Sequence, residues 1–598
     1  MEKLAFPRKS CSTILFLHLL LLFTVSRLAS ADPNTALRDY VNLPDDNYDV
    51  IPLFSQDYPG FKLHFLQMYS QQWRDESETT HPVWSHLITI FEPDLLLSDK
   101  AMLIVNGGSN PVTPDFDPEL GPIVANIAMA TASIIAMVSQ VPNQPIQFFD
   151  LPDPVQEDAL VAYTWDKAMR TGDDFWPVYL PMVKSVVKAM DTLQDFANSE
   201  MEHTINEFVL TGFSKRGAAV WLTAAVDARV LAIAPGVIDF LNLAPHIEHH
   251  FRAYGFYSSA LDDYVDFDIV RRVRTPEGQD LLRIVDPYEY RNLLSLPKFL
   301  INSSGDEFFL PDSARFYFQD LLGEKLIRYV PNTGHDLSNS VSGIQNAISS
   351  LISWYASVIT NTPRPVMQWN HDSGNLAVAA FPQPRAARLW QAHNPNARDF
   401  RRNEIGEAWS STELERNPLG FYHAFVPAPA QGWRAYFIEL EYPSLLSIPQ
   451  TYSTQVYITP DTLPFEVVDP LFDPRRMSFW KKEIKSVAND DDKGTIDSEM
   501  ILSFFPVPLF DTHIFSASQA YDIFFAEDEH NDTLKHCLAT RFNVLNKELG
   551  WYTDLALKRY GTKKLWQHWQ VAHNAYLSNQ PETAKKICIS INNLAPDS

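Results

Sequence analysis

The chain has 598 residues, of which 48 are basic and 73 acidic, so its formal net charge is −25. With 45% hydrophobic and 13% aromatic residues it is neither largely disordered nor collagen-like, and its length allows two to four domains. The acidic surplus argues against nucleic acid or an anionic membrane as partner, because both attract clustered lysine and arginine.

Residues 1–31 have the pattern of a cleaved secretory signal. Lys3 and Arg8 precede a short apolar run at 14–25, and Ala29-Ser30-Ala31 supplies the small residues of a cleavage site. The run is shorter than the roughly 20 residues that span a bilayer, and no later segment is apolar for long enough. We therefore expect a mature chain without a membrane span that is secreted, or held in the endomembrane lumen.

Residues 32–362 alternate short apolar runs with helical patterns. Strands are predicted at 62–68, 86–91, 102–105, 133–139, 208–211, 230–234, 298–301 and 326–330. Helices are predicted at 156–170, 181–197, 215–227, 312–321 and 341–358. This alternation predicts an α/β domain with a mostly parallel sheet covered by helices.

The pattern changes after residue 362. Short alternating runs predict a small antiparallel β-sandwich at 363–460, with strands at 366–369, 376–380, 387–393, 421–426, 435–441 and 455–458. Residues 461–515 have the composition of a linker, and 516–598 are predicted to be helical.

Two covalent modifications are suggested by the sequence. Cys11 is removed with the signal, so the mature chain keeps Cys537 and Cys588. In an oxidising compartment they would either form one disulfide or stay as two separate buried thiols. Asn302 and Asn531 each begin an Asn-x-Ser/Thr sequon, which is a glycosylation signal in a eukaryotic host.

The strongest chemical signal is Gly-Phe-Ser-Lys-Arg-Gly at residues 212–217, where an apolar strand leads into an alanine-rich helix. A tight strand-to-helix turn of this kind presents a nucleophilic serine above the sheet. Ser214 is the predicted nucleophile. The pattern departs from Gly-x-Ser-x-Gly, because Arg216 occupies the second place after the serine and Gly217 the third.

The other members of a triad follow in the order that an α/β-hydrolase requires. Asp306 lies in the turn after the strand predicted at 298–301, and His335 follows Gly334 in the turn after the strand at 326–330. His335 would accept the Ser214 proton, and Asp306 would orient the imidazole. Glu307 is the competing candidate for the acid.

An oxyanion hole is expected from backbone N–H groups. Asn106, Gly107 and Gly108 follow a buried strand, like the glycine-rich loops of lipases, and the N–H of Lys215 begins the helix after the serine. The side chains of Lys215 and Arg216 would either bind an anionic group of the substrate, or point to solvent or pair with acids such as Asp306 and Glu307.

No metal or cofactor is expected. His246, His249 and His250 have helical spacing, but no cysteine or third fixed ligand accompanies them.

Several joined motifs resemble the PhoPQ-activated pathogenicity-related family, which is similar in fold to the α/β-hydrolases. They include residues 159–167, 189–194, 249–257 and 305–313, the Gly-x-Ser-Lys-Arg-Gly turn and the Gly-His turn, and the resemblance covers about residues 35–460. It implies that Ser-Lys-Arg-Gly is the family's own version of the turn, which is also similar to that of glucuronoyl esterases. It further implies a secreted role in repressing proliferation or repelling cells.

Two functions are therefore expected from the sequence. The first is a secreted serine hydrolase for a small-molecule or glycan ester. A peptidase is disfavoured, because the residues before the catalytic domain are too few to form an N-terminal propeller domain. The second is an extracellular signalling protein that uses the hydrolase fold to bind a cell-surface receptor.

Overall fold

The computed structural model describes residues 33–110, 120–337, 341–446 and 448–466. The signal expected at 1–31, most of the linker and the helical region expected at 516–598 lie outside these ranges. Among the residues described, no helix combines the length and the apolar character needed to cross a bilayer. The described residues divide into two compact units: the first contains those up to Ile238 with Pro276–Phe299 and Asp320–Lys325, and the second contains the other described residues.

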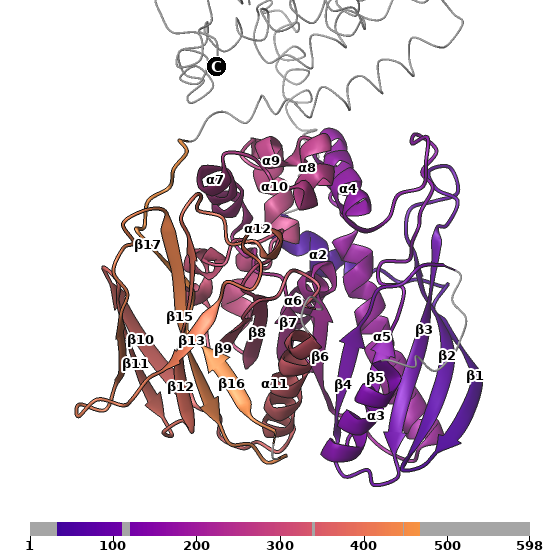
Figure 1. The fold of residues 1–598 in the computed structure, drawn as a ribbon. Coiled ribbons are helices and arrows are strands. Elements are labelled where there is room, and N and C mark those ends of the chain that lie inside the picture. The colour runs from indigo at the N-terminus through magenta and orange to yellow at the C-terminus, as the bar shows by residue number, and fades with distance from the viewer. Residues whose placement is uncertain (1–32, 111–119, 338–340, 447, 467–598) are drawn as a thin grey trace, which may run out of the picture. The chain divides into compact units, whose positions relative to one another are not determined.

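The first unit is built on a mixed sheet (Figure 1). Its strands lie in the order β1 (Asp49–Tyr58), β2 (Phe61–Gln72), β3 (Val83–Pro93), β5 (Ile135–Val138), β4 (Lys100–Val105), β6 (Glu207–Phe213) and β7 (Val230–Gly236). Neighbouring pairs from β1 to β5 are antiparallel, whereas β4 is parallel to β5 and β6, and β6 to β7. Next to β7, β8 (Lys298–Ser303) begins, where Pro297 O accepts a hydrogen bond from Ile233 N at 3.1 Å.

Helices pack against this sheet and against one another, and the central ones bury long apolar stripes. They are α2 (Pro33–Val41), α3 (Leu120–Thr131), α4 (Glu157–Thr171), α5 (Tyr179–Glu200), α6 (Lys215–Val226), α10 (Pro276–Val285) and the 3₁₀ turn η2 (Pro287–Leu293). α4 ends at Gly172, whose φ of 70° is the left-handed conformation that suits glycine at a helix end. Burial of each large apolar side chain contributes about 1.5–3 kcal/mol, so the stripe on α5 holds that helix to the sheet.

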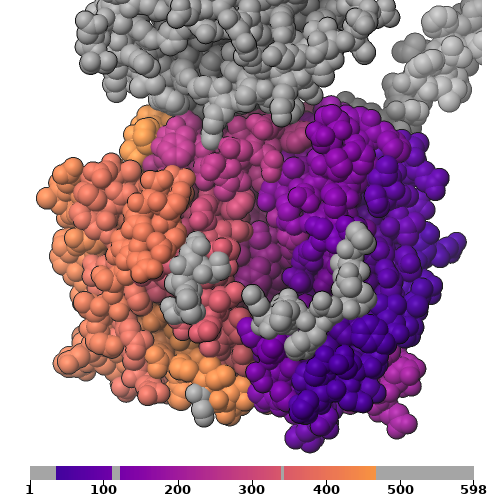
Figure 2. Space-filling model, turned by 45° about the vertical axis from the view of Figure 1, so that its right-hand side comes forward, coloured from indigo at the N-terminus to yellow at the C-terminus, as the bar shows by residue number. Residues whose placement is uncertain are grey.

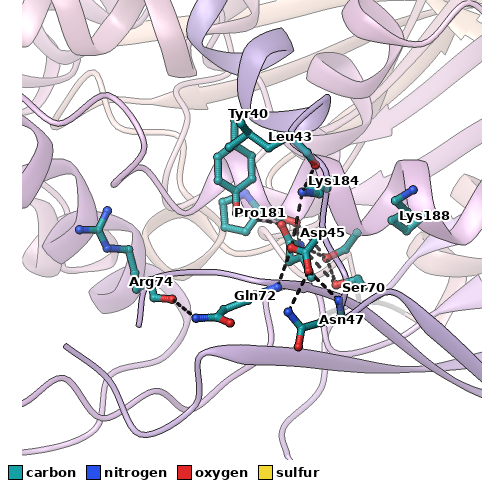
Figure 3. A network of polar contacts seen from close by, with 12 residues as sticks. Tyr40, Leu43, Asp45, Asn47, Ser70, Gln72, Arg74, Pro181, Lys184 and Lys188 are labelled. Atoms are coloured by element: carbon teal, nitrogen blue, oxygen red, sulfur yellow. Dashed lines mark hydrogen bonds and ion pairs between the residues drawn. The ribbon is translucent and has the colours of Figure 1, made fainter. Parts of the chain in front are cut away.

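A buried polar network attaches the first described helix to this core (Figure 3). Lys184 on α5 donates to Leu43 O at 2.8 Å and lies 3.6 Å from Asp45, while Tyr40 donates to Gln71 at 2.9 Å. Burial lowers the pKa of Lys184, and the nearby Asp45 carboxylate opposes the shift. The segment that directly follows the expected signal is therefore part of the folded domain.

The edge strand β1 was not predicted from the sequence. Its side chains are mostly exposed on both faces, so it lacks the apolar alternation of a half-buried strand. The N-terminal strands form part of the molecular surface, coloured indigo in Figure 2.

The second unit begins with α7 (Leu243–Tyr254), η1 (Ser259–Leu261), α8 (Asp262–Asp266) and α9 (Ile269–Arg272). The end of β8 and β9 (Lys325–Val330) follow, then α11 (Val341–Ile359). The helix expected at 312–321 is instead two short 3₁₀ turns, η3 (Ser313–Phe316) and η4 (Phe318–Asp320). Tyr317 between them has φ −148°, because its buried side chain is held by tertiary contacts that override helix propensity.

Two antiparallel sheets complete the second unit. One has the order β10 (Val366–Asp372), β11 (Asn375–Phe381), β14 (Tyr422–Phe425). The other has the order β13 (Ser410–Glu413), β12 (Ala386–Asn394), β15 (Trp433–Tyr442), β16 (Gln450–Ser453), with β17 (Tyr457–Thr459) also paired to β15. Ser373 and Gly374 join β10 to β11 with φ of 48° and 87°, which is typical of a two-residue hairpin turn.

The expected fold class is confirmed: a mostly parallel sheet with packed helices, as in the α/β-hydrolases, is followed by antiparallel sheets.

Candidate active site

Ser214 lies at a sharp turn between β6 and α6. Its φ of 57° and ψ of −130° are rarely adopted by residues other than glycine, and such strain costs about 1–3 kcal/mol. The turn is held by Ser214 N donating to Gly236 O at 2.9 Å and by Ala218 N donating to Ser214 O at 3.1 Å. This is the backbone geometry of a nucleophile elbow.

Two glycines allow the turn to close. A Cβ atom on Gly212 would lie 3.0 Å from the Arg216 carbonyl, and one on Gly217 would lie 2.8 Å from Ile238 Cγ2 and 3.0 Å from Gly212 O. The close approach is therefore made by the third residue after the serine, which explains the departure from Gly-x-Ser-x-Gly.

Lys215 and Arg216 form ion pairs within the protein, which was one of the alternatives considered from the sequence. Arg216 donates to both oxygens of Glu157 at 2.7 and 2.6 Å, and Lys215 Nζ lies 2.9 Å from Glu157 and 3.1 Å from Asp158. The acids that we had named as partners were Asp306 and Glu307. Both cations therefore have acidic partners on α4.

The two acids of this cluster were missed because their role is set by tertiary contacts. Consecutive acids at the start of a predicted helix are typical of the helix dipole, and nothing in their spacing points to residues 215–216. Burial opposes ionisation of Glu157, but hydrogen bonds and charge from Arg216 and Lys215 hold its pKa well below the usual range.

The loop after β4 lies against the same guanidinium. Arg216 Nε donates to Val141 O at 2.6 Å, and a Cβ on Gly107 would lie 2.6 Å from Arg216 Nη2. Gly108 has φ 120°, which only glycine adopts readily. Asn106 N donates to Val138 O at 2.8 Å, so this N–H is used within the sheet and our expectation that it binds the oxyanion is corrected. For Gly107, Gly108 and Lys215 the role of oxyanion donor stays a prediction.

The second unit brings Asp306 and His335 together. His335 Nδ1 lies 2.8 Å from one Asp306 oxygen and 3.0 Å from the other, and the Asp306 side chain is only 3% exposed. Asp306 Oδ1 also accepts from the backbone of Phe308 at 2.8 Å and of Phe309 at 3.2 Å. Glu307, the competing acid, accepts instead from His335 N at 2.7 Å, so it holds the backbone of the turn.

A buried acid close to this pair was not anticipated. Asp239 accepts from the hydroxyls of Tyr317 and Tyr329, each at 2.6 Å. Burial raises the pKa of Asp239 to about 7, although both tyrosine hydrogen bonds oppose the shift and the charge of Asp306 adds to it. No local sequence signal marks this residue, because its partners lie about 80 and 90 residues further along the chain.

The three histidines of α7 are buried structural side chains. His249 Nε2 lies 3.0 Å from Asp312, and His250 Nε2 accepts from Ser258 N at 3.1 Å. Burial lowers the pKa of His246 and of His250 to about 3 each. Within the described ranges, no three His, Cys, Asp or Glu side chains are grouped to hold a metal ion.

One predicted modification site is corrected and others lie outside the described residues. Asn302 lies in β8 with 3% exposure, so the folded chain has no room for a glycan there. Asn531, Cys537 and Cys588 fall in the part of the chain that the structure does not describe.

The family profile and the amoebal relative agree with the resemblance noted from the motifs. Autocrine proliferation repressor protein A of Dictyostelium discoideum is 36% identical over 482 residues, which span 75% of this chain and 94% of that protein. Acetyl xylan esterase 1 from Thermoanaerobacterium sp. is 10% identical, with a TM-score of 0.37 over 55% of this chain and 94% of its own. An acetyl xylan esterase from a Paenibacillus species is 15% identical, with a TM-score of 0.36 over 54% and 92%. Residues 37–401 match the profile of the PhoPQ-activated pathogenicity-related proteins, and the chain belongs to that family.

Proposed function

We propose that the protein is a serine hydrolase that cleaves carboxylic esters through an acyl-enzyme. In this mechanism Ser214 Oγ attacks the ester carbonyl and His335 takes its proton. The tetrahedral intermediate then collapses, and His335 returns the proton to the departing alcohol. Water, activated by the same histidine, releases the acid and restores Ser214.

The observation that supports this proposal best is the conformation of Ser214. A non-glycine residue is kept in a costly backbone conformation only where the surrounding structure requires it, and such strain clusters at reacting side chains. A structural serine at the end of β6 would not need φ 57°.

The acid–base pair supports the same chemistry. With Nδ1 donating to Asp306, Nε2 is the basic nitrogen of the His335 ring, as a general base for serine requires. The rings of Phe308 and Phe309 lie 4.4 and 5.8 Å from the imidazole, so apolar walls limit its contact with water.

Oxyanion stabilisation is assigned to backbone N–H groups of Lys215 and of the Gly107–Gly108 turn. The first N–H groups of α6 have no acceptor within the helix, and its dipole favours a negative charge at this end. Because Lys215 and Arg216 already pair with Glu157 and Asp158, we assign to the substrate a neutral group next to the scissile bond, in a small-molecule or glycan ester.

We further propose that the chain is secreted, on the basis of the signal pattern at residues 1–31. Expression in a eukaryotic cell, followed by N-terminal sequencing of the protein recovered from the medium, tests this. A mature N-terminus near Asp32 is expected, and an uncleaved intracellular chain would contradict it.

The hydrolase proposal is tested by labelling the purified protein with a fluorophosphonate and measuring ester hydrolysis. Wild type and a Ser199→Ala control are expected to react with the label and to cleave short-chain esters. Ser214→Ala is expected to lose both activities while keeping its thermal stability. If the wild type neither labels nor turns over any ester, the proposal fails.

A second function is favoured by the amoebal relative, whose name describes an autocrine proliferation repressor. In this alternative the secreted chain represses proliferation or repels cells by binding a surface receptor, with or without turnover. Adding wild-type and Ser214→Ala protein to responsive cells separates the two functions. Equal repression by both would show signalling independent of hydrolysis, and loss of repression in the variant would tie the effect to the nucleophile.

A further inference from the structure

Residues 398–409, in the connection between β12 and β13, cross the two turns that carry Asp306 and His335. We call these residues the strap. The strap includes the short helix α12 (Arg402–Ile405), and side chains at both its ends contact other residues of the second unit. Phe400 and Trp409 are 1% and 3% exposed, and the Trp409 ring lies 5.3 Å from that of Phe437 on β15. Thus the strap is a fixed part of the unit that holds the antiparallel sheets.

The first contact is with the acid turn. Arg402 N donates to Gly305 O at 2.8 Å, directly before Asp306. A Cβ atom on Gly305 would lie 2.8 Å from Arg402 N and 2.9 Å from Thr333 O, so the glycine is needed for this approach. Gly305 N donates to that Thr333 oxygen at 3.0 Å, which joins the acid turn to the base turn.

The second contact is with the base turn. Asn332 Nδ2 donates to Trp409 O at 2.9 Å, and Trp409 N donates to Asn332 Oδ1 at 3.0 Å. Asn332 has φ 59°, a conformation in which asparagine is favoured over most other residues. Arg402 Nε adds a hydrogen bond to Asn332 O at 3.2 Å. The strap therefore holds the residue three positions before His335 by its side chain and its backbone.

A third contact fixes the start of the strap. The Arg398 side chain is fully buried, and its Nη2 lies 2.7 Å from Asp312, which also pairs with His249 at 3.0 Å. Removing one partner of a buried ion pair is strongly destabilising, so this end cannot leave easily.

We infer that the strap is a positioning element for the acid and the base, which makes hydrolysis depend on residues of the predicted β-sandwich. The inference rests on the proposed hydrolase function for its kinetic test, and on the contacts above for its structural test. Gly305 and Asn332 are positioning residues, because they act on the reacting groups only through Asp306 and His335.

A matched pair of variants at residue 402 tests the inference. Arg402→Pro removes the N–H that donates a hydrogen bond to Gly305 O, and the proline ring would clash with that oxygen. Proline is tolerated in the first turn of a helix, and Arg401 already has φ −58° and ψ 144°, as a residue before proline prefers. Arg402→Ala loses the same side chain but keeps the N–H. Comparing the two isolates the contact with the acid turn.

We expect Arg402→Pro to lower kcat about tenfold or more relative to Arg402→Ala, with KM and the titrated amount of reactive Ser214 unchanged. A merely structural strap would lower the amount of folded enzyme instead, without changing kcat per active site. Equal kcat in the two variants would overturn the inference.

A second readout does not depend on catalysis. Hydrogen exchange of the 303–310 and 331–336 segments is expected to be faster in Arg402→Pro than in Arg402→Ala, because Phe308 N and Phe309 N bond to Asp306. If the wild type proves inert towards esters, the hydrolase proposal fails and exchange alone decides about the strap. Unchanged exchange would then overturn it.

Discussion

Glu157→Gln tests whether the charge cluster beside Ser214 stabilises the fold. The carboxylate accepts two hydrogen bonds from Arg216, at 2.7 and 2.6 Å, and lies 2.9 Å from Lys215. The cation side chains are 11% and 6% exposed, whereas that of Glu157 is 40% exposed. A neutral amide would leave Arg216 buried without a charged acceptor.

The magnitude follows from these contacts. Hydrogen bonds to charged groups contribute about 1.5–3 kcal/mol each, but solvent screens Glu157 and Lys215 keeps Asp158 as a partner. We therefore expect the free energy of unfolding to fall by about 2–3 kcal/mol at neutral pH, which lowers Tm by roughly 5 °C. The control Asp280→Asn breaks an exposed pair with Arg283 and should cost less than about 1 kcal/mol.

The difference in stability between wild type and Glu157→Gln should depend on pH in a defined direction. The pKa of Glu157 is lower in the folded chain than its ordinary value of 4.5, so its stabilisation is complete above that pH. As the pH falls below 4.5 towards the folded pKa, the carboxylate takes up a proton and the difference between wild type and Glu157→Gln should shrink. Differential scanning fluorimetry from pH 3 to pH 8 measures it. A variant as stable as wild type, or a difference that does not change with pH, would refute the reasoning.

Three further outcomes are expected. Gly217→Ala should lower Tm, because its Cβ would lie 2.8 Å from Ile238 and 3.0 Å from Gly212 O. The control Gly172→Ala has no atom within 4 Å of its Cβ, so only its left-handed backbone conformation should destabilise it. Scanning fluorimetry of both variants measures the difference in Tm. Ser214→Gly should raise Tm by relieving a strain of about 1–3 kcal/mol while abolishing ester cleavage, and a fall in Tm would count against the strain. The pKa of Asp239 is about 7 in the folded chain and near 3.8 when unfolded, so its contribution to the free energy of unfolding should fall as the pH rises from 4 to 7. In urea titrations, Asp239→Asn should remove this part of the pH dependence.

The parts of the site that could be predicted are local in sequence. The serine turn and the acid and base turns each follow an apolar strand, and in an α/β sheet the ends of such strands are where reacting groups lie. Continuous apolar runs also located the buried strands, because both faces of these strands are covered.

The parts that could not be predicted depend on distant contacts. Glu157 meets Arg216 across 59 residues, Asp239 meets Tyr329 across 90, and Asn332 meets Trp409 across 77. In the local sequence Glu157 and Asn332 look like ordinary surface or turn residues, and nothing near Lys215 and Arg216 identifies their acidic partners. The edge strand β1 was missed for a different reason, since exposure on both faces removes the alternation that marks a strand.

The central claim is that Ser214 forms an acyl-enzyme, and trapping that intermediate tests it most directly. The purified protein is mixed with an activated phenyl ester, quenched in acid within milliseconds to seconds, and analysed by intact mass and peptide mapping. We predict a burst of one phenolate per chain and one acyl group on the peptide containing Ser214, with acylation slowed at least 100-fold in His335→Ala. A chain that releases no burst, or that carries the acyl group on another residue, would contradict the claim.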